Sequence, residues 1–177
     1  MRALGRTALV IIILCSTALC AGAQPVRSWE LAGGYTRAND SPNLVTLNGW
    51  LADGGVRITP WLAAIVEASD VRTTIVDVTL RTASVVAGPR AAARIGPFVE
   101  FVQLTSGWGQ FRSTVFDETT SDNHLLLQPG GGLDVPFKSR FAARFQVDRR
   151  MILGGELDAQ DRHQLRLAVC LVVLSRP

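Results

Sequence analysis

The most regular feature of the sequence is an alternation of apolar and polar residues with a period of two. Between residues 165 and 173, every odd position is Leu or Val, whereas the even positions include Arg166 and Cys170. Between residues 141 and 147, Phe, Ala, Phe and Val alternate with a set that includes Arg144. Successive residues of a β-strand point to opposite faces, whereas a helix repeats every 3.6 residues. Both segments are therefore predicted to be strands with one apolar face.

Six further segments complete a set of eight predicted strands. Three of them alternate in the same way and three are predicted mainly from their spacing; the full set is 28–37, 47–58, 61–70, 79–88, 98–105, 125–135, 141–148 and 165–173. Short connections (59–60, 90–97 and 136–139) alternate with longer polar ones (38–46, 71–78, 106–124 and 149–162). Short turns at one end and long loops at the other are typical of membrane barrels. We predict an all-β fold, an eight-stranded antiparallel up-and-down transmembrane β-barrel.

A barrel in lipid turns its apolar face outward, so the charged face lines a narrow interior. An isolated charge there costs several kcal/mol and needs a partner of opposite sign. The alternation places both signs inside, and we predict an interior charge network of Glu30, Glu67, Asp134, Arg144, Asp148 and Arg166. Eight strands leave only enough room for side chains to fill the interior. The lumen is therefore expected to be plugged, with a conducting gate formed by the same residues as the alternative.

The composition and the N-terminus indicate an exported globular or membrane protein. With 177 residues, 47% of them apolar, a net charge of +3 and three Cys, the chain is neither disordered, nor a disulfide scaffold, nor a polybasic nucleic-acid binder. Arg2 and Arg6 precede an uncharged run at 8–18, and small residues follow at 21–23. This is the pattern of a secretory signal peptide, and the run is too short for a membrane-spanning helix. We expect a signal peptide at 1–23 and a barrel domain at 24–177.

Several short phrases carry a resemblance to a known family. They are LAGGY at Leu31–Tyr35, LNGW at Leu47–Trp50, VAGPR at Val86–Arg90, GGGLDV at Gly130–Val135 and LRLAV at Leu165–Val169. In this order and spacing the chain resembles the small outer membrane β-barrel proteins related to the transmembrane domain of outer membrane protein A. The resemblance implies a closed barrel in a bacterial outer membrane, with outer membrane lipids and lipopolysaccharide as partners. It includes no second, peptidoglycan-binding domain.

Catalytic, cofactor and metal sites are not predicted. The two histidines, His124 and His163, fall at predicted loop boundaries, and no Ser lies within two residues of either; Ser121 and Asp122 precede His124, but the sequence does not provide the geometry by which a triad is recognised. No His, Asp or Glu spacing matches a metal motif, and the glycines at 130–132 do not precede a helix as a phosphate-binding loop would. Two alternatives stay open. One is a lipid-modifying enzyme on a small barrel; the other is a soluble periplasmic lipocalin-like barrel, with the apolar positions of 165–173 facing a small ligand.

The long connection at 106–124 is the predicted contact surface. It carries aromatic and basic residues, and Trp108, Phe111, Arg112 and Phe116 are expected to contact an extracellular partner or lipid headgroups, or to pack the loop against the rim. Removal of the signal peptide also removes Arg2 and Arg6, so a nearly neutral chain remains and nucleic acid is not an expected partner. The sequence thus predicts a non-enzymatic outer membrane barrel with a structural or surface-interaction role.

Overall fold

The structure, a computed structural model, describes residues 29–41, 45–75, 78–116, 118–153 and 163–175. The predicted signal peptide lies outside the described residues. Eight strands make up almost all of the described chain: β1 Trp29–Ser41, β2 Val45–Arg57, β3 Leu62–Ile75, β4 Val78–Ile95, β5 Phe98–Val115, β6 Glu118–Lys138, β7 Phe141–Leu153 and β8 His163–Leu174. No helix in this part of the chain is long and apolar enough to span a membrane.

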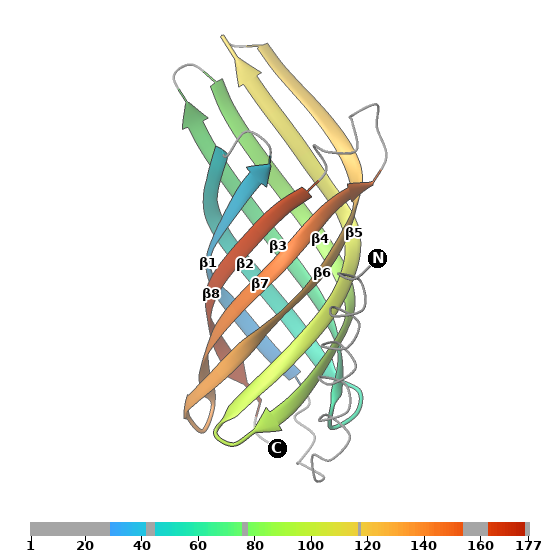
Figure 1. Ribbon diagram of the computed structural model, residues 1–177, viewed down its shortest axis with the longest axis vertical. Coiled ribbons are helices and arrows are strands. Elements are labelled where there is room, and N and C mark those ends of the chain that lie inside the picture. Colours follow the sequence, from blue (N-terminus) through green and yellow to red (C-terminus); the bar gives the residue numbers. More distant parts are fainter. Residues whose placement is uncertain (1–28, 42–44, 76–77, 117, 154–162, 176–177) are drawn as a thin grey trace, which may run out of the picture.

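The eight strands form one closed antiparallel barrel in which each strand pairs with its neighbours in the sequence. The barrel closes between β1 and β8, where Leu31 pairs with Val173 and Arg37 pairs with Leu167. Figure 1 shows the strands wrapping obliquely around the long axis of the barrel. Each predicted strand overlaps one observed strand in the same order, so the predicted fold class is confirmed.

The three short connections lie together at one end of the barrel (Figure 1). Residues 58–61 form the first, and the backbone N–H groups of Ile58 and Thr59 both donate to the carbonyl of Leu62. Trp61 lies in this turn, so the alternation of inward and outward side chains along a strand does not apply to it. Gly96 forms the second turn with a φ of 60°, a left-handed conformation that glycine adopts without steric cost.

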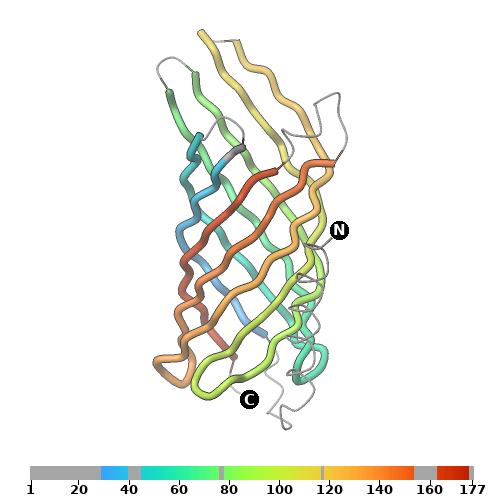
Figure 2. The backbone as a smooth tube through the Cα atoms, viewed as in Figure 1, coloured from blue at the N-terminus to red at the C-terminus, as the bar shows by residue number. Residues whose placement is uncertain are grey.

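At the opposite end the strands are longer than the alternation indicates. The predicted loop at 106–124 is wrong, because β5 and β6 stay paired as far as Val115 and Glu118. Trp108, Phe111 and Arg112 are therefore strand residues, and only Phe116 lies in the turn. Figure 2 shows this hairpin rising beyond the rest of the barrel. Outward positions here are polar because they lie above the apolar band. The sequence therefore shows no apolar and polar alternation in this part of the strands.

The inner and outer faces of the strands differ in the direction expected for a membrane barrel. Leu167 and Leu171 on β8 face outward and are 44% and 50% exposed, whereas Arg144 on β7 and Arg166 on β8 are each 1% exposed. The exterior thus carries the large apolar side chains and the interior carries the ionised ones. This arrangement contradicts the soluble lipocalin-like alternative, since such a barrel must keep its apolar residues inside.

Candidate functional site

Arg144 is the centre of a charged cluster in the half of the interior nearer the short turns. Its guanidinium donates five hydrogen bonds, two to Asp134 at 2.7 and 2.8 Å, two to Asp53 at 2.9 and 3.2 Å and one to Glu30 at 2.9 Å. These carboxylates come from β6, β2 and β1, so one side chain on β7 ties together strands on opposite sides of the barrel. Charge-assisted bonds of this kind are stronger than neutral ones.

Arg90 on β4 completes this cluster from the other side. Its guanidinium donates to Glu30 at 2.7 Å and to Asp53 at 3.3 Å, so both carboxylates are shared with Arg144. The ring of Phe101 lies against both cations, with its centroid 4.6 Å from Arg90 Cζ and 4.9 Å from Arg144 Cζ. A ring face attracts cations that have lost their water. Phe101 therefore fills the space between the two arginines, and its ring adds a favourable contact to each guanidinium.

A second cluster surrounds Arg166 near the middle of the barrel. Arg166 Nη2 lies 2.6 Å from both Glu67 on β3 and Asp148 on β7. Neutral amides complete the contacts of the two acids, because Gln146 donates to both at 2.9 Å and Gln128 donates to Glu67 at 3.0 Å. All of these groups are almost fully buried. The two carboxylates are thus held by one arginine and by amide donors.

Gln103 on β5 links the two clusters. Its amide nitrogen donates to Asp148 at 3.0 Å, and its amide oxygen accepts two bonds from Arg90 at 2.8 and 2.9 Å. Both ends of the amide are therefore used, and the bonds run without a break from one charged cluster to the other. We call the whole set of bonded groups the interior network: Glu30, Asp53, Glu67, Arg90, Gln103, Gln128, Asp134, Arg144, Gln146, Asp148, Arg150 and Arg166.

Arg150 forms the end of the interior network nearer the long hairpins. It donates to Gln128 at 3.1 Å, to Ser84 at 2.9 Å and to Ser69 at 3.2 Å, and no carboxylate of the described residues lies within ion-pair distance. Neutral oxygens therefore accept the bonds of a buried cation. The Nη1 atoms of Arg150 and Arg166 are buried without a hydrogen-bond partner in the described structure.

The six residues predicted to form the charge network all lie inside the barrel, and each has an ionic partner there. The alternation missed three buried charges of the network, Asp53, Arg90 and Arg150. It also missed Arg57, whose guanidinium lies 3.8 Å from Glu30 at the short-turn end. These residues can be found once the strand pairing is known, because every second residue of a strand points inward and the inward positions can be counted along it.

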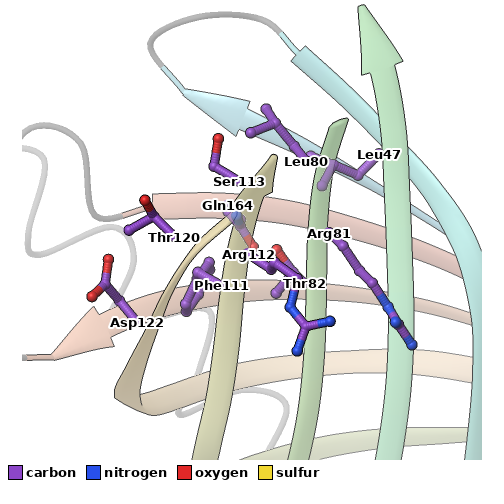
Figure 3. A pocket seen from close by; sticks show the side chains of 10 residues that line it. All are labelled: Leu47, Leu80, Arg81, Thr82, Phe111, Arg112, Ser113, Thr120, Asp122 and Gln164. Carbon is purple, nitrogen blue, oxygen red and sulfur yellow. The ribbon is translucent and has the colours of Figure 1, made fainter. Parts of the chain in front are cut away.

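A cavity of about 150 Å³ opens at the end with the long hairpins. The residues that line it come from β2, β4, β5, β6 and β8 (Figure 3); they are Leu47, Leu80, Arg81, Thr82, Phe111, Arg112, Ser113, Thr120, Asp122 and Gln164. Phe111 is half-buried here, with its ring 5.6 Å from that of His124. It therefore packs the inside of the rim. Trp108, by contrast, points outward and is 71% exposed, and Phe116 in the turn is 78% exposed.

A smaller cavity, of about 10 Å³, lies at the short-turn end and is lined by Glu30, Arg57, Arg90 and Arg144 among others. The interior network lies between the two cavities. His163, which begins β8, has its Nδ1 atom buried without a hydrogen-bond partner in the described structure. Among the described residues, no group of three His, Cys, Asp or Glu side chains is arranged to hold a metal ion.

Comparison with known structures identifies the architecture. No protein-family model matches the sequence, and no curated protein matches it. The solved structure of Neisserial surface protein A superposes with a TM-score of 0.69 at 12% identity, covering 85% of this chain and 99% of the other. The attachment invasion locus protein Ail of Yersinia pestis gives 0.59 at 17% identity, with coverages of 85% and 99%. This chain has the fold of a small outer membrane β-barrel. OprG from Pseudomonas aeruginosa is also similar, with a TM-score of 0.54 at 7% identity and coverages of 87% and 96%.

The exterior of the barrel has an apolar band with aromatic residues at both margins. Trp29 and Phe98 face outward near the short turns and are 44% and 41% exposed. Toward the other end Tyr35 pairs with Trp50, both on the outer face, and Trp108 lies on β5. Aromatic girdles mark the two interfaces of outer membrane barrels, in which the short turns face the periplasm. In barrels of this fold, the end that carries the longer connections faces the cell exterior.

Proposed function

We propose that this protein is a non-enzymatic outer membrane barrel that acts through its extracellular surface, with a lumen closed by the interior network. The observation that carries the proposal is the continuity of that network. Hydrogen bonds lead from Asp134 through Arg144, Asp53, Arg90, Gln103 and Asp148 to Arg166. A solute that passes must break charge-assisted bonds in a space already filled by side chains.

Charge balance supports a closed lumen over a gate. The arginines of the interior, Arg57, Arg90, Arg144, Arg150 and Arg166, are matched in number by the carboxylates of Glu30, Asp53, Glu67, Asp134 and Asp148. An interior without net charge gives no overall preference for ions of either sign. Breaking one member of such a network leaves a buried charge unpaired, which costs about 3–5 kcal/mol. The closed arrangement is therefore the low-energy state.

Recording from planar bilayers tests the closed lumen. Purified full chain is expected to insert without stable conductance steps, and Arg166→Ala is expected to leave this unchanged, because Arg144 and Arg90 still close the other cluster. Arg149→Ala, at an exposed position on the same barrel, is the matched control for the loss of a positive charge. Reproducible steps in the wild-type protein that disappear or change in Arg166→Ala would establish a gate instead and refute the closed lumen.

The extracellular surface is the proposed site of action. The β5–β6 hairpin extends furthest (Figure 2) and ends at Phe116, an aromatic residue 78% exposed. Exposed aromatic residues are enriched where proteins bind partners. The Yersinia pestis protein Ail, which shares this fold, is known in complex with the heparin analogue sucrose octasulfate, and this supports a role in surface interaction.

Labelling of intact cells tests which end is outside. Phe116→Cys is expected to react with a membrane-impermeant maleimide on intact cells, whereas Ser139→Cys, in the short turn between β6 and β7, is expected to react only after the outer membrane is permeabilised. The native Cys170 is 3% exposed inside the barrel and serves as an unreactive background. The opposite labelling pattern would place the hairpins in the periplasm and would overturn the proposed surface role.

A further inference from the structure

The cavity at the end with the long hairpins, which we call the mouth pocket, lies against the inner face of β4, β5 and β6. Its lining there consists of two cross-strand rows, one of Leu80, Ser113 and Thr120 and the other of Thr82, Phe111 and Asp122. Two residues from other strands, Leu47 on β2 and Gln164 on β8, also line the pocket (Figure 3). Apolar groups, hydroxyls, one amide and one carboxylate therefore surround the same small space.

The polar groups of the mouth pocket leave acceptors unused. Asp122 has no ion pair within the described residues. Gln164 is 3% exposed, and its Oε1 atom is buried without a hydrogen-bond partner in the described structure. The hydroxyl groups of the two rows can accept as well as donate. The pocket thus offers a ligand one negative charge and a second, neutral acceptor.

The two arginines among the lining residues do not neutralise Asp122. Arg81 and Arg112 alternate with the inward residues of β4 and β5, so their exposed side chains belong to the outer face. Arg81 is bound there by Asp70. Neither guanidinium forms an ion pair with Asp122. The inner wall of the mouth pocket therefore keeps its negative charge.

Phe111 places an aromatic ring beside the carboxylate. Phe111 and Asp122 are direct cross-strand partners on β5 and β6, so their side chains are neighbours on the same face. Phe111 is half-buried and its ring lies 5.6 Å from that of His124, which fixes one side of the ring. The face of an aromatic ring attracts cations, and a carboxylate binds a charged donor more strongly than a neutral one. The pair therefore favours an ammonium group over a neutral or anionic one.

The size of the mouth pocket suits a short aliphatic stem. Its volume of about 150 Å³ matches that of a cavity that holds one benzene ring. Leu47, Leu80 and Phe111 supply the apolar contacts. Asp122 and Gln164 lie on strands that are not neighbours, so they approach a ligand from different directions. A primary ammonium has three N–H donors that diverge, whereas a guanidinium presents its donors in one plane.

We propose that the mouth pocket binds a primary ammonium group on an aliphatic stem, carried by a lysine side chain of an extracellular protein. The ammonium donates to Asp122 and Gln164, and the stem packs on Phe111 and the two leucines. Lysine suits such a site because its stem is buried readily in apolar surroundings while its charged end keeps polar partners. The proposal names a partner for the extracellular surface and rests on the proposed function, which places this end of the barrel outside the cell.

Isothermal titration calorimetry of the folded full chain in non-ionic detergent tests the mouth pocket, with n-butylammonium as the probe. Asp122→Asn is expected to bind it about tenfold more weakly, because a charge-assisted bond is lost. Asp122→Glu is expected to recover part of this loss. Phe111→Leu is expected to bind about threefold more weakly, because it keeps an apolar contact but removes the ring face. 1-Butanol, which has the same stem without the charge, is expected to bind wild type about tenfold more weakly than n-butylammonium does.

Two matched controls lie on the same hairpin and do not line the mouth pocket. Glu118→Gln removes a negative charge from an exposed position of β6, and Phe116→Leu removes an exposed ring from the turn. Both are expected to bind n-butylammonium like wild type. Equal affinities of Asp122→Asn and Glu118→Gln would refute the proposal, as would 1-butanol that binds as tightly as n-butylammonium.

Two blocked tripeptides separate a lysine side chain from a free amine. Acetyl-Gly-Lys-Gly-amide is expected to bind at least as tightly as n-butylammonium. Acetyl-Gly-Arg-Gly-amide is expected to bind about tenfold more weakly, because its guanidinium is wider and planar. A pocket that binds n-butylammonium but not the lysine peptide takes a free amine, and this result would overturn the lysine partner. Equal affinities for the two peptides would also contradict the proposal.

Failure of this proposal is distinguishable from failure of the proposed function. Heat-modifiable gel mobility shows for each variant whether the barrel is folded, and the bilayer and labelling experiments do not depend on any amine. A folded, correctly oriented, non-conducting barrel that binds n-butylammonium no better than 1-butanol would refute only the ammonium site.

Discussion

Removal of the Arg144 guanidinium is expected to destabilise the barrel more than any surface substitution. Arg144→Met keeps most of the side-chain volume but removes five hydrogen bonds to three buried carboxylates. Arg90 still holds Glu30 and Asp53, whereas Asp134 loses the only cation that the described structure gives it. Leaving one buried charge unpaired costs about 3–5 kcal/mol. This is a large part of the roughly 5–15 kcal/mol that stabilises a typical protein.

Urea unfolding in detergent micelles, followed by tryptophan fluorescence, measures this change. We expect a loss of about 4 kcal/mol for Arg144→Met with an unchanged dependence on urea, which is roughly a thousandfold in the folding equilibrium. Asp134→Asn in the same chain is expected to restore part of the loss by removing the stranded charge. Arg149→Met, on the same strand but exposed, is expected to change stability by less than about 0.5 kcal/mol. If Arg144→Met lost no more than Arg149→Met, the interior network would contribute nothing to stability.

Two further substitutions test the close approach of strands and the lipid-facing surface. Gly34→Ala is expected to lose roughly 2 kcal/mol of folding free energy, because its Cβ would lie 2.6 Å from Cys170 Cα and still closer to the Val169 carbonyl oxygen. Gly33→Ala is expected to be neutral, because its Cβ would meet nothing nearer than 3.9 Å. Equal urea midpoints for the two variants would contradict this difference. In lipid vesicles, Leu167→Arg is expected to lower the folding free energy by about 2–4 kcal/mol, because the new charge would face hydrocarbon. Thr74→Arg, above the apolar band, is expected to change it little. A Leu167→Arg variant as stable as wild type would argue against lipid contact at that position.

The strands with strong contrast between their faces could be predicted from the sequence. On β7 and β8, charged and large apolar residues alternate, and the parity of Arg144 and Arg166 follows directly from that pattern. On β2, the residues that flank Asp53, Ala52 and Gly54, are both small, so no large apolar side chain on the outer face contrasts with Asp53. The same holds for Arg90 on β4, which follows Gly88 and Pro89.

The partners of the interior charges could not be predicted from the sequence. Arg144 bonds Glu30, which is 114 residues away in the chain. Which acid meets which arginine across the barrel depends on the shear of the closed sheet, and alternation fixes only the face of each residue, not its height.

Oxygen accessibility of spin labels along β8 tests the inverted barrel most directly. In a Cys170→Ala background, single cysteines replace Leu165, Leu167, Ala168, Val169 and Leu171 in turn, and the labelled barrel is reconstituted in phospholipid vesicles. Oxygen concentrates in hydrocarbon, so labels at the four odd positions are expected to collide with it frequently and the label at position 168 rarely. High accessibility at position 168 together with low accessibility at 167 and 171 would mean that the apolar face of β8 points into the barrel, and it would contradict the account.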